Sequence, residues 1–241
     1  MRAETRHQLK QDRFSKVTFE AAEATVNWSQ EHQSKLIFGA IGLIVIAAIV
    51  FGGWYYINQQ DLKASFEMSD AVRTMGAQLR SPGTPAQPGF PSFESVTDRA
   101  TAARKQFQAI ADKYPQTKSG KMARYFVGVT SAQLGDYTNA EGDLQEVAHS
   151  SNSDLASLAK FALASVYRTE KKDAQAIDLY KQLMAKPTEL VSKVEAQFEL
   201  ASMYESEQKP DEAKKIYQDI QKENPKSDAF TIAQRRMTDL K

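Results

Sequence analysis

The sequence contains no cysteine among its 241 residues. Disulfide bonds, thiolate metal sites and a cysteine nucleophile are therefore excluded. A bacterial lipoprotein is excluded as well, because lipid attachment requires an N-terminal cysteine. Any attachment to a membrane must be made by the polypeptide itself.

The chain also has almost no net charge and few histidines. Lys and Arg number 31 against 30 Asp and Glu, so no basic bias favours nucleic-acid binding. The three histidines have no metal-ligand spacing, and no GxSxG, phosphate-loop or dinucleotide pattern occurs. We expect no catalytic residue, no metal, no cofactor and no small-molecule substrate. An enzyme stays as the alternative class, although carboxylate pairs such as Asp211 and Glu212 are more typical of a solvated surface.

One segment is strongly apolar. Residues 36–57 contain 22 residues without a charge, and as a helix they would extend about 33 Å, enough to cross a bilayer core. Trp54, Tyr55 and Tyr56 stand at one end, where aromatic rings favour the headgroup zone. A cleaved signal peptide would have a shorter apolar core and a small-residue cleavage site. We therefore predict an uncleaved transmembrane anchor.

The orientation of this anchor depends on its flanks. Within twenty residues of the span each side has only two basic groups, so the local charge rule gives no preference. The whole tail, residues 1–35, has six basic residues, which favours a cytosolic N-terminus. We expect the tail to be partly helical and the C-terminal region to be exported.

A repeat fills the second half of the chain. Small residues recur at spacings of 37, 36 and 37, namely Ala103, Ala140, Ala176 and Ala213. Each is followed by a large residue four positions later and an aliphatic one seven positions later, which places the three on one helical face. Twelve positions before the last three alanines stand further small residues: Gly128, Ala164 and Ala201. The turn segments "LGDY", "EKKD" and "EQKPD" separate the two helices of each unit.

At these positions the sequence resembles the tetratricopeptide repeat family, and "EAQFELASMYESEQKPDEAKKIYQDIQKENP" matches best. The first unit departs from the pattern, because Ser131 stands where tyrosine is usual. The resemblance implies an all-α superhelix of helical hairpins with three full repeats, one split repeat and a C-terminal capping helix, behind one N-terminal transmembrane helix. The small residues that would allow close helix packing are Gly128, Ala140, Ala164, Ala176, Ala201 and Ala213.

A proline-rich segment interrupts the first hairpin. Four prolines, three residues apart, stand at Pro82, Pro85, Pro88 and Pro91, and they exclude a helix there. The expected order is therefore the tail, the anchor, a helix over 58–80, a proline-rich loop over 81–95 and the repeat domain over 96–241. The proline spacing predicts a polyproline II helix, which is either a ligand for an aromatic groove or a stiff connector.

The family resemblance also implies a concave groove lined by the first helix of each repeat. Its groove positions fall on Met122, Tyr125, Val129, Leu158, Phe161, Ser165, Arg168, Glu195, Phe198, Ser202 and Glu205. The three aromatic residues recur at the repeat period and would form a ladder that suits extended or helical peptide segments. The alternative is that these rings pack between neighbouring repeats and meet no ligand.

The whole architecture is similar to that of the YfgM-like proteins, tetratricopeptide proteins anchored in the bacterial inner (plasma) membrane. The matching parts are "FEAAEATVNWSQEHQSKL", "GGWYYINQQDLKASFEMSDAV" and the repeats behind them, whereas the proline insertion departs from that family. This resemblance implies a periplasmic repeat domain and an adaptor ancillary to the Sec translocon. Its partners would be translocon subunits, periplasmic chaperones or exported clients. A scaffold for envelope assembly or cell division is the alternative.

Overall fold

The structure is a computed structural model that describes residues 32–81, 83–85 and 89–240, so most of the predicted tail lies outside the described residues. The chain divides into two compact units, residues 1–56 and 57–241. Helices dominate the described residues of both units, which confirms the all-α prediction. The first described helix, α2 (Gln33–Met75), begins in the first unit.

The N-terminal part of α2 is apolar and exposed. Its most hydrophobic stretch has a mean hydropathy of 2.7, and none of its residues is buried. Side chains such as Phe38 and Ile44 are exposed. This helix is long and apolar enough to cross a bilayer. A signal sequence near the N-terminus would meet the same criteria of length and composition. The structure thus establishes a long apolar N-terminal helix.

The C-terminal part of α2 forms the split hairpin with α3 (Val96–Lys113). Ala64 and Ala71 of α2 belong to one buried cluster with Phe107 of α3. The Lys113 Nζ donates to Glu67 Oε1 at 2.7 Å. Arg99 donates to the carbonyl oxygen of Ala77, so the two helices run antiparallel.

Two short strands, β1 (Gln78–Leu79) and β2 (Ser92–Phe93), close this hairpin and pair in parallel. The sequence did not predict them. Gly83 and Gly89 have φ values of 80° and 84°, whereas polyproline II requires a φ near −75°. The prediction of a continuous polyproline II helix across the proline segment is therefore wrong.

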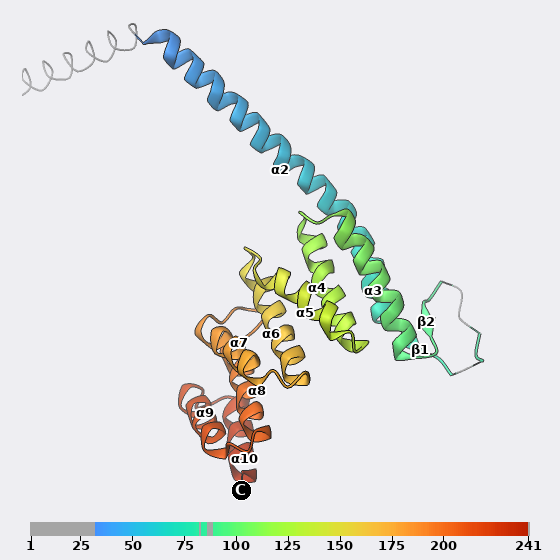
Figure 1. The fold of residues 1–241 in the computed structure, drawn as a ribbon, viewed down its shortest axis with the longest axis vertical. Coiled ribbons are helices and arrows are strands. Elements are labelled where there is room, and N and C mark those ends of the chain that lie inside the picture. The colour runs from blue at the N-terminus through green and yellow to red at the C-terminus, as the bar shows by residue number, and fades with distance from the viewer. Residues whose placement is uncertain (1–31, 82, 86–88, 241) are drawn as a thin grey trace, which may run out of the picture. The chain divides into compact units, whose positions relative to one another are not determined.

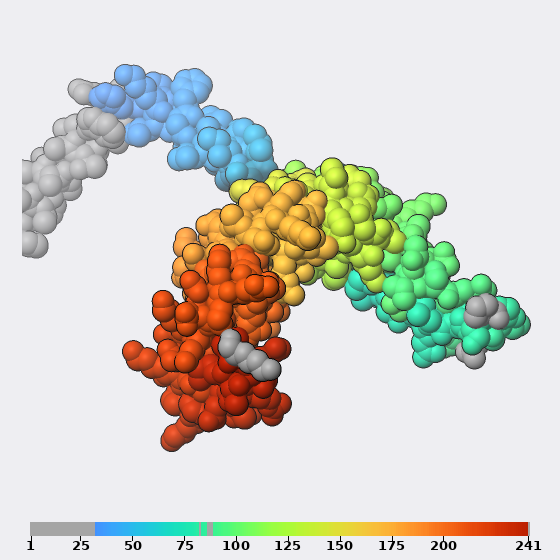
Figure 2. Space-filling model, turned by 60° about the horizontal axis from the view of Figure 1, so that its bottom comes forward, coloured from blue at the N-terminus to red at the C-terminus, as the bar shows by residue number. Residues whose placement is uncertain are grey.

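The remaining helices form the full hairpins and the last helix, in chain order (Figure 1). The hairpins pair α4 (Lys118–Gln133) with α5 (Tyr137–Ala148), α6 (Ser153–Thr169) with α7 (Asp173–Ala185) and α8 (Lys193–Ser206) with α9 (Pro210–Glu223), and α10 (Asp228–Asp239) follows. Figure 2 shows their packed surfaces following one another from green through yellow to red.

The turns inside the hairpins share one backbone conformation. Gly135, Lys171 and Gln208 stand at equivalent positions, and their φ values are 79°, 58° and 58°. Glycine adopts this left-handed region without strain, whereas Lys171 and Gln208 do so at a cost. In each of these hairpins the second helix begins two residues after this position.

Small residues permit the close helix contacts. Ala140, Ala164, Ala176, Ala201 and Ala213 are completely buried. At Gly128 an added Cβ would lie 2.6 Å from the Cγ of Leu144 on the partner helix. The large residues four positions after the second-helix alanines fill the core, as Phe107, Leu144, Tyr180 and Tyr217 are almost fully buried.

Candidate partner-binding groove

The aromatic residues of the predicted groove lie on the first helices of the three full hairpins. Tyr125 is on α4, Phe161 on α6 and Phe198 on α8, and all three side chains are half-buried. They are therefore neither free surface groups nor core residues. Burial raises the pKa of the Tyr125 hydroxyl.

Each aromatic ring also has a neighbour of its own. Phe161 meets Tyr180 edge-on with centroids 5.8 Å apart, and Phe198 lies 6.1 Å from Tyr217. Tyr125 meets the adjacent Phe126 at 5.2 Å. One side of each ring thus contributes to packing within its own helix or hairpin, while part of its surface stays open. The edge contacts of Tyr125 and Phe161 fix the orientation of those two rings.

The smaller groove residues vary in exposure. Met122, Val129, Leu158 and Ser202 are half-buried, whereas Ser165 is exposed. Several apolar members, among them Met122 and Leu158, pack on the buried cluster of the central hairpins. The apolar residues at the predicted groove positions therefore extend the hydrophobic core toward the surface.

The charged groove residues have intramolecular partners. The Arg168 Nη1 lies 2.9 Å from Glu199 Oε2 on the next first helix. Glu205 accepts a hydrogen bond of 2.8 Å from the Tyr217 hydroxyl. Burial and the contact with Glu205 raise the pKa of Tyr217.

Glu195 has a structural role at the start of α8. Its carboxylate accepts from the backbone N–H of Ser192 at 2.8 Å, while the Ser192 hydroxyl accepts from the Glu195 N–H. This reciprocal pair is a capping box. Its sequence signal, "SKVE", was available, because serine followed three residues later by glutamate is typical of a helix start.

Sequence reasoning missed the polar links that join successive helices. Arg124 of α4 lies 3.1 Å from Asp143, 3.2 Å from Glu146 and 3.8 Å from Asp112. Burial raises the pKa of Asp143, although Arg124 opposes that shift. No local sequence pattern predicts this cluster, because its members come from three different helices.

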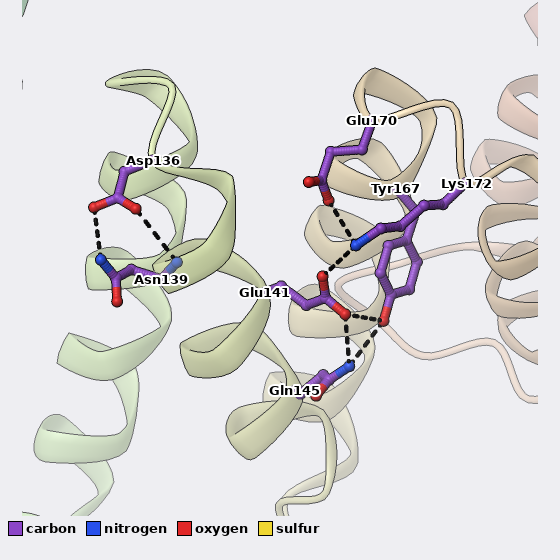
Figure 3. A network of polar contacts seen from close by, with 7 residues as sticks. All are labelled: Asp136, Asn139, Glu141, Gln145, Tyr167, Glu170 and Lys172. Atoms are coloured by element: carbon purple, nitrogen blue, oxygen red, sulfur yellow. Dashed lines mark hydrogen bonds and ion pairs between the residues drawn. The ribbon is translucent and has the colours of Figure 1, made fainter.

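A second network surrounds Tyr167 at the junction of α5 and α6 (Figure 3). The Tyr167 hydroxyl donates to Glu141 Oε1 at 3.1 Å and accepts from Gln145 Nε2 at 2.8 Å. The Lys172 Nζ lies 2.7 Å from Glu141 and 3.1 Å from Glu170. The contact with Glu141 contributes most to raising the pKa of Lys172. These contacts tie one hairpin to the next.

The described residues contain no group of three or more His, Asp or Glu side chains that could hold a metal ion. A protein family described as Tetratricopeptide repeat-like domain matches residues 26–241. The comparison with curated proteins gives no match. Domains of this all-helical repeat type are typically non-catalytic, and they generally mediate protein–protein interactions. The family match, the repeat period and the buried small residues agree, and the chain belongs to the tetratricopeptide repeat-like family.

Proposed function

We propose that this protein is a membrane-anchored adaptor whose groove binds segments of other proteins. The observation that carries the proposal is the recurrence of half-buried Tyr125, Phe161 and Phe198 on successive first helices. Aromatic rings that keep part of their surface open, on a rigid scaffold, suit the anchoring of a peptide segment.

The groove combines these rings with charges already held in place. Arg168 pairs with Glu199 near the surface, and both side chains stay partly exposed. Exposed ion pairs contribute little to stability, so a partner can compete for them at small cost. The expected ligand is an extended or helical segment with apolar side chains flanked by charged ones.

The anchor is the apolar part of α2, over residues 36–57. Its side chains are exposed in the isolated chain, and a lipid environment would cover them. Attachment would raise the effective concentration of the groove near other membrane proteins. Together with the resemblance to YfgM-like proteins, this favours a periplasmic adaptor of the bacterial inner membrane that assists the Sec translocon or exported chaperones. A scaffold for envelope assembly or division is the second candidate.

Photo-crosslinking in native membranes tests this function. A photoreactive amino acid replaces Tyr125, Phe161 or Phe198 in turn, and captured proteins are identified by mass spectrometry. The control is the same replacement at Lys181, an exposed position of the second helix α7. We expect capture of translocon subunits, periplasmic chaperones or exported clients from the groove positions only.

The alternatives give different outcomes. Capture of division or outer-membrane assembly proteins from the groove would replace the translocon role with the scaffold role. Equal capture from the position of Lys181 would show that the groove is not the binding surface. Melting temperatures of the variants, measured alongside, separate lost binding from lost folding.

A further inference from the structure

The connection between α7 and α8, residues 186–192, is longer than the other connections between successive hairpins. It has seven residues, whereas four residues each make up the connections 114–117, 149–152 and 224–227. The repeat period is nonetheless kept, because Ala201 stands 37 residues after Ala164. The difference lies in α8, which begins eight residues before Ala201, whereas α6 begins eleven residues before Ala164. The loop therefore takes the place of one turn of α8.

This loop has a defined shape. The Thr188 backbone N–H donates to the Val191 carbonyl oxygen at 2.9 Å, and the Val191 N–H donates to the Thr188 hydroxyl oxygen at 3.2 Å. The same hydroxyl lies 2.7 Å from the hydroxyl of Ser157, a buried residue of α6. The Val191 side chain is buried as well. These contacts fix the loop on the preceding hairpin.

Leu190 is held exposed by the loop. Its side chain is 51% exposed, at the repeat position that Ser153 occupies at the start of α6. A surface hollow of about 390 Å³ lies beside it, bordered also by Met122 of α4 and Leu155 of α6. Leu155 is buried, whereas all the other side chains that line the hollow are half-buried or exposed. The hollow is therefore open to solvent and has three apolar side chains in its wall.

The rim of the hollow has an excess of positive charge. Lys118 and Lys121, in the first turn of α4, line it together with the carboxylate of Asp154 on α6. Neither lysine ammonium group makes an ion pair or a hydrogen bond with another described residue. Two positive charges thus face one negative charge, and both lysines are available to a ligand. This arrangement favours an acidic ligand over a basic one.

We propose that this hollow binds an apolar side chain of a partner protein that is flanked by acidic residues. The apolar side chain would contact Met122, Leu155 and Leu190, and the neighbouring carboxylates would face Lys118 and Lys121. Met122 is also one of the predicted groove positions. The inference therefore rests on the proposed function, and it adds the chemistry that one end of the bound segment should have.

Tethering of short peptides to the full-length protein in detergent tests the proposal. The chain has no cysteine, so one introduced thiol is unique. Ser151→Cys places it at an exposed position that lines the hollow, and Thr231→Cys, on an exposed position of α10, is the matched control. In the three probe peptides a cysteine and a glycine precede leucine with two glutamates, leucine with two lysines, or serine with two glutamates. Mass spectrometry measures the bound fraction of each peptide under increasing reductant.

We expect the thiol at position 151 to distinguish the three peptides. It should retain the leucine–glutamate peptide about threefold more strongly than the leucine–lysine peptide, a small factor because the charge pairs are exposed. The advantage over the serine–glutamate peptide should be about fivefold, because the leucine side chain becomes partly buried. The thiol at position 231 should show no preference.

Two further changes identify the residues responsible. Lys118→Glu combined with Lys121→Glu should reverse the charge preference at position 151. Both changes lie in the first turn of α4, where acidic residues favour the helix and none is present, so the domain should stay folded. Leu190→Ser, at an exposed position, should reduce the advantage of leucine over serine.

Equal retention of the three peptides at position 151, or the same preference at position 231, would overturn the proposal. A charge preference that survives the double lysine replacement in a folded variant would do so too. Should that variant fail to fold, the comparison of positions 151 and 231 still decides. Such failures leave the proposed function intact if the groove positions capture partner proteins by photo-crosslinking. The expected preference at position 151 without any capture from the groove would support the hollow and contradict the groove.

Discussion

Ala176 illustrates how single residues set the close packing of the hairpins. It is completely buried on α7, whereas Ala174, two residues earlier on the same helix, is exposed. Ala176→Leu should lower the free energy of unfolding by about 1–3 kcal/mol, because the added atoms overpack a tight helix contact. Ala174→Leu should change it by less than about 0.5 kcal/mol. Chemical denaturation of both variants measures the difference, and equal effects would mean that the repeat positions are assigned wrongly.

Tyr180 makes the stability of the repeats sensitive to high pH. Burial raises the pKa of its hydroxyl to about 12, whereas an unfolded tyrosine has a pKa of about 10. Below pH 10 both states are protonated and this residue causes no pH dependence. As the pH rises from 10 to 12, only the unfolded state loses its proton, so the stability that this residue supports falls, by about 2 kcal/mol in all.

The Tyr180→Phe variant tests whether ionisation of this hydroxyl lowers the stability at high pH. The variant should match the wild type within about 1 kcal/mol at pH 7 and fall less steeply between pH 10 and 12, because it has no proton to lose there. Urea unfolding at both pH values gives the measurement. A parallel decline of the two proteins would show that other groups, such as Tyr217, control alkaline unfolding.

At the scale of elements, the turns of the second and third full hairpins carry a correctable strain at Lys171 and Gln208. Lys171 lies between α6 and α7 with a φ of 58°, at the position that glycine occupies in the first repeat. Lys171→Gly should stabilise the domain by up to about 1 kcal/mol, because glycine enters this region without a Cβ clash. Lys181→Gly, in the middle of α7, should instead cost about 1 kcal/mol. Destabilisation by both would show that the turn is not strained.

The helices could be predicted from the sequence because their signals are local and repeated. Alanines such as Ala140 and Ala176, at a fixed period with large residues four positions later, specify two packed helices per unit. The strands β1 and β2 could not, since two residues carry no periodicity. The polyproline II prediction counted prolines and ignored Gly83 and Gly89, whose backbone angles end such a helix.

The helices that carry the proposed groove residues could be predicted from the sequence, but the contacts of those residues could not. The repeat period places Phe161 and Phe198 on first helices, because backbone geometry repeats with the sequence. That Arg168 pairs with Glu199, and that Glu205 accepts from Tyr217, depends on side chains from different helices. A family pattern reports which face a residue lies on, and the neighbouring helix decides how much of that residue stays available.

At the scale of the whole molecule, the hairpins cannot fold as separate units. Each buries its apolar face against the next, so buried clusters extend across neighbouring hairpins, as where Tyr167 of α6 packs in one cluster with Leu144 of α5. The first hairpin takes its first helix from the C-terminal part of α2, through Ala64 and Ala71. A deletion that removes residues 57–75 should therefore expose the α3 face and destabilise the repeat beside it.

The membrane topology is the last prediction, and the absence of cysteine makes it simple to test. Thr5→Cys places one thiol in the tail, and Lys214→Cys places one on an exposed position of α9. In bacterial spheroplasts a membrane-impermeant maleimide should label the thiol at position 214 at once and the thiol at position 5 only after lysis. The opposite pattern would reverse the orientation that the tail charges favour. Intact mass measurement is the second readout: a mature chain beginning after residue 57 would replace the anchor with a cleaved signal sequence, whereas retention of the full chain in the membrane fraction supports the anchor.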